Sequence, residues 1–139
     1  TVQEVGSLLF ARTTNPAGDE LGTFTNVTRP TDDNVRDLIK QASRDTQVRI
    51  GVSIPAAYTD IVHHLVALRA AMLVELGYFP EQINASHSAY EEYKTLYDEG
   101  LAALVEAVSD EPGMEAEGPT GAPVFYFPDA QLVGWKTVW

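Results

Sequence analysis

The longest pattern of apolar residues at helical spacing runs from Ile54 to Phe79 and predicts one helix. Pro55 suits a first helical turn, because the fixed φ and the missing N–H of proline are tolerated there. Gly77 stands where such a helix is expected to end. A helix that is apolar on most of its circumference is buried on several sides, so we expect the rest of the domain to pack around it. Its first apolar row is Ile61, Leu65, Leu68, Met72 and Leu76, and a second row is Val62, Val66 and Leu73.

Two further long helices are predicted on either side of this central one. Thr31, followed by two aspartates, is a typical N-cap, and Gly51 is placed to end that helix after Ile50. Ser88 is the expected N-cap of the other helix, which runs to about Val108. The predicted buried faces are Val35, Leu38, Ile39 and Ala42 in the first, and Tyr90, Tyr93, Tyr97, Leu101, Leu104 and Val108 in the second.

These faces predict which residues the central helix contacts. We expect its Leu65–Leu76 half to form the core, in contact with Val35, Leu38 and Ile39 and with the Leu101–Val108 half of the last helix. The Tyr58–His64 half is more polar, and we expect it to lie nearer a boundary between subunits.

The first 30 residues are less regular. Thr1 and Glu4 have the spacing of a capping box, so a short helix is predicted over residues 1–11, although Gly6 weakens it. Residues 12–29 are rich in Thr, Asn and Gly around the turn signal Asn15-Pro16-Ala17-Gly18, which indicates a small β-hairpin or an ordered loop.

The pattern changes again after residue 110. Residues 111–123 are rich in Gly, Pro and Glu and are predicted to be a flexible linker that forms no core. Residues 124–139 are aromatic and β-branched, which favours extended structure. This end is either a strand that folds back on its own domain or an arm that docks on another subunit. The candidate docking residues are Val124, Phe125, Tyr126, Phe127, Leu132, Val133, Trp135, Val138 and Trp139.

The fold class that follows is mainly α. We expect a small bundle of three long helices with a short N-terminal helix, a β-hairpin insertion at residues 12–29 and an extended, β-prone C-terminal arm. The helical domain covers residues 1–110, the linker residues 111–123 and the arm residues 124–139. The central helix is not expected to span a membrane, because its nearly apolar part from Leu65 to Leu76 is short and contains Arg69 and Glu75.

Charge and composition reduce the number of function classes that fit the chain. Nine basic and 20 acidic residues give a net charge of −11, which argues against a surface that grips nucleic acid. The chain has no cysteine, so disulfides and thiolate chemistry are excluded. The last helix has the most acidic face, with five acids against Lys94 alone. These acids are Glu91, Glu92, Asp98, Glu99 and Glu106.

The sequence offers little for catalysis. Asp60 and His64 lie four residues apart, but no third ligand follows at helical spacing, and the adjacent His63 points to another side of a helix. Ser86, His87 and Ser88 lack the motif of a hydrolase, and the glycines have no phosphate-binding spacing. We therefore expect no enzyme activity, no catalytic residues, no metal and no cofactor.

Three segments resemble the head-to-tail adaptor, or connector, proteins of long-tailed bacteriophages, especially those that infect actinobacteria. They are GTFTNVTRPTDDNV at Gly22–Val35, LVALRAAMLVELGYFPEQI at Leu65–Ile83 and SAYEEYKTLYDEGLAAL at Ser88–Leu104. The resemblance extends over residues 1–110, and no family motif covers the linker or the arm.

The resemblance implies a structural virion protein that is assembled in the host cytoplasm into a ring, expected to be dodecameric. The ring lies at the capsid vertex between the portal protein and the next connector or tail component, and DNA passes through its channel without specific binding. The acids expected to line that channel are Glu91, Glu92, Asp98 and Glu99. An alternative from another class is a soluble acidic helical module with a binding or regulatory role, similar to a DNA mimic or an antitoxin.

Overall fold

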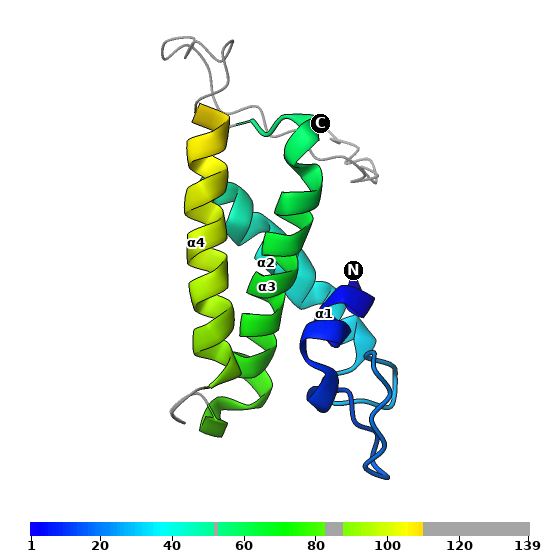
Figure 1. The fold of residues 1–139 in the computed structure, drawn as a ribbon. Coiled ribbons are helices and arrows are strands. Elements are labelled where there is room, and N and C mark those ends of the chain that lie inside the picture. Colours follow the sequence, from blue (N-terminus) through cyan, green and yellow to red (C-terminus); the bar gives the residue numbers. More distant parts are fainter. Residues whose placement is uncertain (52, 83–87, 110–139) are drawn as a thin grey trace, which may run out of the picture.

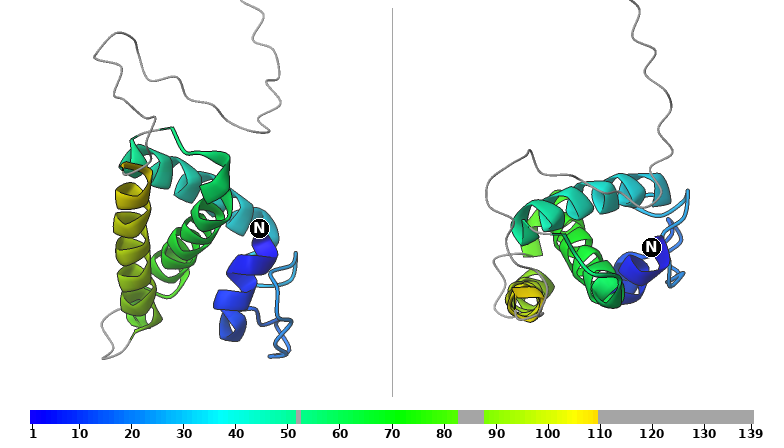
Figure 2. Two further views of the ribbon diagram at one scale, coloured as in Figure 1. Left: turned by 45° about the horizontal axis from the view of Figure 1, so that its top comes forward. Right: turned by 90° about the horizontal axis from the view of Figure 1, so that it is seen from above.

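Helix α3, Thr59–Tyr78, makes the most extensive contacts with the other three helices (Figure 1). The computed structural model describes residues 1–51, 53–82 and 88–109. Helix α4 packs alongside α3, α2 crosses α3, and α1 packs against both α2 and α3 (Figure 2). The predicted helical bundle is confirmed. The helices are α1 (Val2–Leu8), α2 (Asp32–Ile50), α3 and α4 (Ala89–Ser109), with short 3-10 helices at Phe10–Arg12, Ala56–Tyr58 and Pro80–Gln82.

The predicted ends of α2 and the predicted start of α4 are confirmed. The Asn34 N–H donates to Thr31 Oγ1 at 3.4 Å, and Gly51 ends α2 in the left-handed region at φ 68°. Only glycine adopts that conformation without steric cost. The Glu91 N–H donates to Ser88 Oγ at 3.3 Å, so Ser88 caps α4. Local capping chemistry therefore fixes these three helix ends.

Both predicted ends of the central helix are wrong by a few residues. Pro55 precedes the 3-10 helix Ala56–Tyr58, and the α-helix begins only at Thr59. At the other end, Gly77 is still helical and Phe79 leaves the helix at φ −134°. Phe79 precedes Pro80, and a residue before proline is disfavoured in the helical conformation. The proline rather than the glycine explains where α3 ends.

The core consists of two clusters that share α3. One joins α1 and α2 to α3, and it contains Val35 together with Val66 and Val74, with Leu38 and Ile39 packed against it. The other joins α3 to α4 and to the end of α2, and it contains Ile50, Leu65, Leu68, Met72, Tyr97, Leu104 and Val108. The expected partners of α3 are therefore confirmed.

Two residues of the predicted apolar row of α3 are not in the core. Ile61 is 46% exposed and Leu76 is 40% exposed, whereas Leu65 and Leu68 between them are each 1% exposed. The row is thus buried in the middle of α3 and leaves an apolar side chain exposed near each end.

By length and composition alone, the stretch Ala56–Tyr78 could cross a membrane, with a mean hydropathy of 1.3 over its most apolar window. The packing gives a different reason for its apolar character. Helices α1, α2 and α4 cover α3 on different sides, and Arg69 and Glu75 within it form ion pairs with other elements. These are the properties of the core helix of a globular domain.

The predicted β-hairpin at residues 12–29 is wrong, and the ordered loop is what forms. In the described part of the chain there is no β-strand, only an isolated antiparallel bridge between Thr14 and Glu20. Backbone N–H groups of this loop donate hydrogen bonds to nearby polar side chains, in place of a ladder of hydrogen bonds between two strands. The Gly22 N–H donates to Thr13 Oγ1 at 2.9 Å, and the Ala17 and Asp19 N–H groups donate to Asn15 Oδ1 at 2.9 Å each.

Helix α1 is shorter than predicted but begins as expected. The Thr1 and Glu4 capping box is present, and the α-helix ends at Leu8 before the 3-10 helix Phe10–Arg12. Gly6 faces the loop, and a Cβ atom at this position would lie 2.9 Å from the Thr23 Cα atom. The glycine that weakens α1 locally is what allows it to approach the loop.

Candidate functional site: the acidic outer face of α4

The acids predicted to line a channel all lie exposed on α4, but they form two separate rows. Residues seven apart lie two turns apart on nearly the same side of a helix. Glu92 and Glu99 are related in this way, and Glu106 continues their row by another seven residues. Glu91 and Asp98 form the second row, one residue earlier.

The two rows differ in their ion pairs. Asp98 faces α2, because its carboxylate lies 3.3 Å from Arg49 Nη1 and 3.3 Å from Lys94 Nζ. Within the described residues, Glu92, Glu99 and Glu106 form no ion pair. Glu91 forms none there either, so Asp98 is the neutralised acid of the predicted acidic face. We call the row Glu92–Glu99–Glu106, in which no member is paired within the described residues, the outer acidic row.

Sequence reasoning did not include Glu106 among the channel-lining candidates. The signal that identifies it is the repeat of seven residues from Glu92 through Glu99. At about 1.5 Å per residue, the three carboxylates are spaced about 10 Å apart and the row is about 20 Å long. This is a linear array of negative charge on one rigid element.

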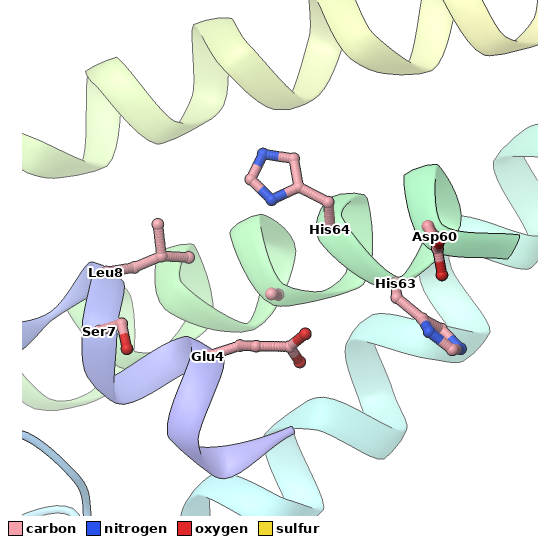
Figure 3. A pocket seen from close by; sticks show the side chains of 7 residues that line it. Glu4, Ser7, Leu8, Asp60, His63 and His64 are labelled. Carbon is pink, nitrogen blue, oxygen red and sulfur yellow. The ribbon is translucent and has the colours of Figure 1, made fainter. Parts of the chain in front are cut away.

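A second candidate is an open groove of ≈ 400 Å³ between α1 and the first turns of α3 (Figure 3). The imidazoles of His63 and His64 turn to different sides of α3, as their adjacent positions predict (Figure 3). In the described residues, no three His, Cys, Asp or Glu side chains are arranged to hold a metal ion. The groove is lined by Glu4, Ser7, Leu8, Asp60, His63, His64 and Ala67.

Glu4 in this groove is held by the start of its own helix. The Thr1 ammonium donates to the Glu4 carboxylate, and the Glu4 N–H donates to the Thr1 hydroxyl. The contact with the ammonium is the main cause that lowers the pKa of Glu4. The first turns of α3 are exposed at Asp60, His63 and His64. The boundary between subunits that we expect at this half of α3 stays a prediction. His87 lies outside the described residues.

A buried ion pair holds the irregular N-terminal segment to α3. Arg12 Nε donates to Glu75 Oε1 at 2.9 Å, and Arg12 Nη2 donates to Glu75 Oε2 at 3.1 Å. The Glu75 side chain is 3% exposed, and the Arg12 guanidinium lies 4.3 Å from the centre of the Phe79 ring. The two-point geometry satisfies both carboxylate oxygens, so this pair is structural.

Tyr93 joins α4 to the end of α1. Its hydroxyl donates to the Leu8 carbonyl oxygen at 2.6 Å. Burial raises the pKa of the Tyr93 phenol above its usual 10.0, and the negative charges of Glu75 and Glu92 raise it further. A neutral phenol is therefore the form that the folded protein favours.

Replacing Tyr93 with Phe is expected to lower the free energy of unfolding by about 1 kcal/mol at neutral pH, through loss of one hydrogen bond. Because the folded pKa is raised, the contribution of Tyr93 is complete below the unfolded pKa of 10.0 and is lost as the pH rises through the folded pKa. The deficit of the variant should therefore shrink above pH 10. Denaturant titrations across that range measure it.

Tyr90→Phe is the matched control, because the Tyr90 hydroxyl makes no hydrogen bond within the described residues. It should change the free energy of unfolding by less than about 0.5 kcal/mol at neutral pH. A Tyr93→Phe deficit that stays constant from neutral pH to pH 11 would contradict the assigned role.

The predicted docking residues from Val124 to Trp139 all lie outside the described residues. The structure therefore neither brings them together nor separates them, and the arm remains a prediction from composition. No protein-family model, curated protein or solved structure matches this chain.

Proposed function

We propose that this protein is a structural component of a bacteriophage virion, a head-to-tail adaptor that forms a ring between the portal protein and the tail. The proposal rests on the resemblance of Gly22–Val35, Leu65–Ile83 and Ser88–Leu104 to that family. The observation that carries it on the structural side is the outer acidic row of α4, which no basic side chain of the described residues neutralises.

In this proposal the outer acidic row faces the channel. Copies of α4 around a ring axis would line the opening with carboxylates, and these repel the DNA phosphates. Repulsion of this kind keeps the DNA from adhering to the wall as it passes. Asp98 is paired with Arg49 of α2 and with Lys94, so it contributes less than the row of Glu92, Glu99 and Glu106.

The alternative of a DNA mimic is less well supported by the spacing of the charges. Each strand of DNA carries a phosphate for about every 3.4 Å of helix axis. The carboxylates of the outer acidic row are spaced about 10 Å apart, and Asp98 beside them is neutralised by Arg49 and Lys94. Such a row repels DNA, but it is too sparse to reproduce a phosphate backbone.

Electron microscopy of the protein mixed with its portal tests the proposal. Rings attached to the portal are expected, with a symmetry that the images give directly. Protein that forms no ring, alone at high concentration or with the portal, and remains a compact monomer or dimer would favour the soluble binding module.

The arm is tested in the same assay. Deletion of residues 111–139 is expected to abolish the joining of portal and tail, because the apolar arm supplies the contact with a neighbour. A full-length variant with Phe125, Tyr126, Trp135 and Trp139 replaced by Ser keeps the length of the chain and should fail in the same way. If the portal and the tail still join after both changes, the arm does not supply the contact that holds them together.

The channel assignment has its own test in a triple variant with Glu92, Glu99 and Glu106 replaced by Gln. Ring formation should be retained, while the association of DNA with the ring at low salt should rise about tenfold as the repulsion is removed. A control variant, Asp19→Asn with Glu20→Gln and Glu81→Gln, removes three exposed charges elsewhere. Equal effects of the two triple variants would contradict a channel position for the outer acidic row.

A further inference from the structure

The facing parts of α2 and α3 gather three arginines in a protein of net charge −11. They line a groove of ≈ 350 Å³ together with one aspartate and one valine. We call this the arginine groove; its residues are Arg44, Asp45, Val48, Arg49 and Arg69.

Two of the three arginines have an acidic partner. Arg69 Nη2 lies 2.8 Å from Asp45 Oδ2, and Arg49 Nη1 lies 3.3 Å from Asp98 Oδ1. Arg44 is exposed and forms no ion pair within the described residues. Three guanidinium groups therefore face two carboxylates, and the excess positive charge resides on Arg44.

An apolar side chain lies beside this unpaired charge. Val48 follows Arg44 by one helical turn and is 75% exposed, the most exposed of the large hydrophobic residues of the described chain. A surface that combines an unpaired guanidinium with an exposed valine fits an extended segment that carries carboxylates and an apolar residue.

The segment directly after α4 has this composition. Residues 110–117 read DEPGMEAE, with four acids, no basic residue and Met114 between the acidic pairs. The last described residue of α4, Ser109, lies at the same end of the domain as the end of α2. Val108 at the end of α4 and Ile50 at the end of α2 belong to one buried cluster, and both helix ends lie close together in Figures 1 and 2.

The distances suit a contact within one molecule. Arg49 and Arg44 are five residues apart on α2, which corresponds to about 7.5 Å along the helix axis. Eight residues of extended chain span up to about 26 Å, so the segment can reach both arginines from Ser109. The outer acidic row of α4 would repel the segment, which leaves the α2 side as the favourable one.

We propose that residues 110–117 dock in the arginine groove of their own chain, with carboxylates on Arg44 and Arg49 and with Met114 against Val48. The proposal stands whether or not the chain forms a ring, because groove and segment belong to one molecule.

The absence of cysteine in this chain permits a direct test in the chain of 139 residues. Ala116→Cys provides a single site for a nitroxide spin label between Glu115 and Glu117. At low salt, the label should broaden the amide signals of α2 around Arg44 and Val48 and those of α3 around Arg69. Molar salt should remove the broadening, because the contact depends on exposed charges.

Arg44→Glu in the labelled protein should lower the ratio of docked to free segment about fivefold, since an ion pair is replaced by a repulsion. Lys40→Glu is the matched control, because it makes the same charge change one turn earlier, where Lys40 already pairs with Asp37 at 2.8 Å. The control should retain most of the broadening.

Three results would overturn the proposal. The first is an absence of broadening at the groove in the parent protein at low salt. The second is an equal loss of broadening in Arg44→Glu and Lys40→Glu, which would indicate a general electrostatic attraction rather than binding at one site. The third is broadening in a mixture of labelled chains with isotope-enriched unlabelled chains, which would assign the segment to a neighbouring copy.

Discussion

Replacing Glu75 with Gln is expected to lower the free energy of unfolding by about 3–5 kcal/mol, the largest effect of a single side chain that we predict. The change keeps the shape of the side chain and removes its charge. The Arg12 guanidinium, whose side chain is 20% exposed, then loses the negative charge of the Glu75 carboxylate. Denaturant titration at neutral pH measures the difference.

The reason for this size is the cost of removing one charge from an ion pair whose carboxylate is buried. In the native protein both oxygens of Glu75 accept hydrogen bonds from Arg12, at 2.9 and 3.1 Å. Gln offers one acceptor and presents an NH2 group to a cation, so one of the two bonds is replaced by an unfavourable contact. The N-terminal segment also loses part of its polar attachment to α3.

Two variants separate the charge from the packing. Arg36→Gln breaks an exposed ion pair in which Arg36 Nη2 lies 3.3 Å from Asp32 Oδ2, and it should cost less than about 1 kcal/mol. Arg12→Met combined with Glu75→Leu removes both charges and should recover much of the stability lost in Glu75→Gln. A Glu75→Gln effect no larger than that of Arg36→Gln would contradict the structural role of the buried pair.

The Arg12–Glu75 pair also illustrates what the sequence cannot predict. The two residues are 63 positions apart, and the pattern around Arg12 favoured an extended strand. The acid with which Arg12 forms an ion pair depends on how the N-terminal segment crosses the end of α3. That path is decided by packing between distant segments and leaves no periodic signal in the sequence.

Local rules, in contrast, predicted α2 and the start of α4 correctly. Thr31, Gly51 and Ser88 act through atoms within a few residues of themselves, so their roles can be read without the tertiary structure. The same kind of local chemistry explains the wrong β-hairpin. Thr13 and Asn15 bind nearby backbone N–H groups with their own side chains, which competes with pairing between strands.

The candidate site was predictable in part. The acids of α4 are exposed, as a run of charges on an amphipathic helix predicts. Which of them remain unpaired depends on the position of Arg49 on α2, and this is known only once the two helices are packed. The arginine groove was not predicted, since Arg69 joins it from a different helix.

The second large prediction concerns glycines in helices, where one substitution is expected to have opposite effects at two positions. Glycine in a helix interior is about 0.5–1 kcal/mol less favourable than alanine, so Gly→Ala normally stabilises. At Gly77 a Cβ atom would have no heavy atom within 4 Å. Gly77→Ala should therefore raise the free energy of unfolding by about 0.5–1 kcal/mol.

Gly6→Ala is expected to do the reverse and to lower the free energy of unfolding by about 1–3 kcal/mol. Its Cβ would lie 2.9 Å from the Thr23 Cα atom and 3.2 Å from the Gly22 carbonyl oxygen, and both are backbone atoms. Relief requires α1 to move away from the loop, which would disturb the contacts of Val5 and Leu9 in the first core cluster.

A third glycine shows why the identity of the neighbouring atom decides the outcome. A Cβ at Gly100 would lie 2.8 Å from Leu65 Cδ2, which is the end of a side chain that can change rotamer. Gly100→Ala should accordingly cost less than Gly6→Ala, although the distance is shorter. Parallel denaturant titrations of the three variants rank them, and a Gly6→Ala protein as stable as Gly77→Ala would show that α1 does not pack on the loop at this distance.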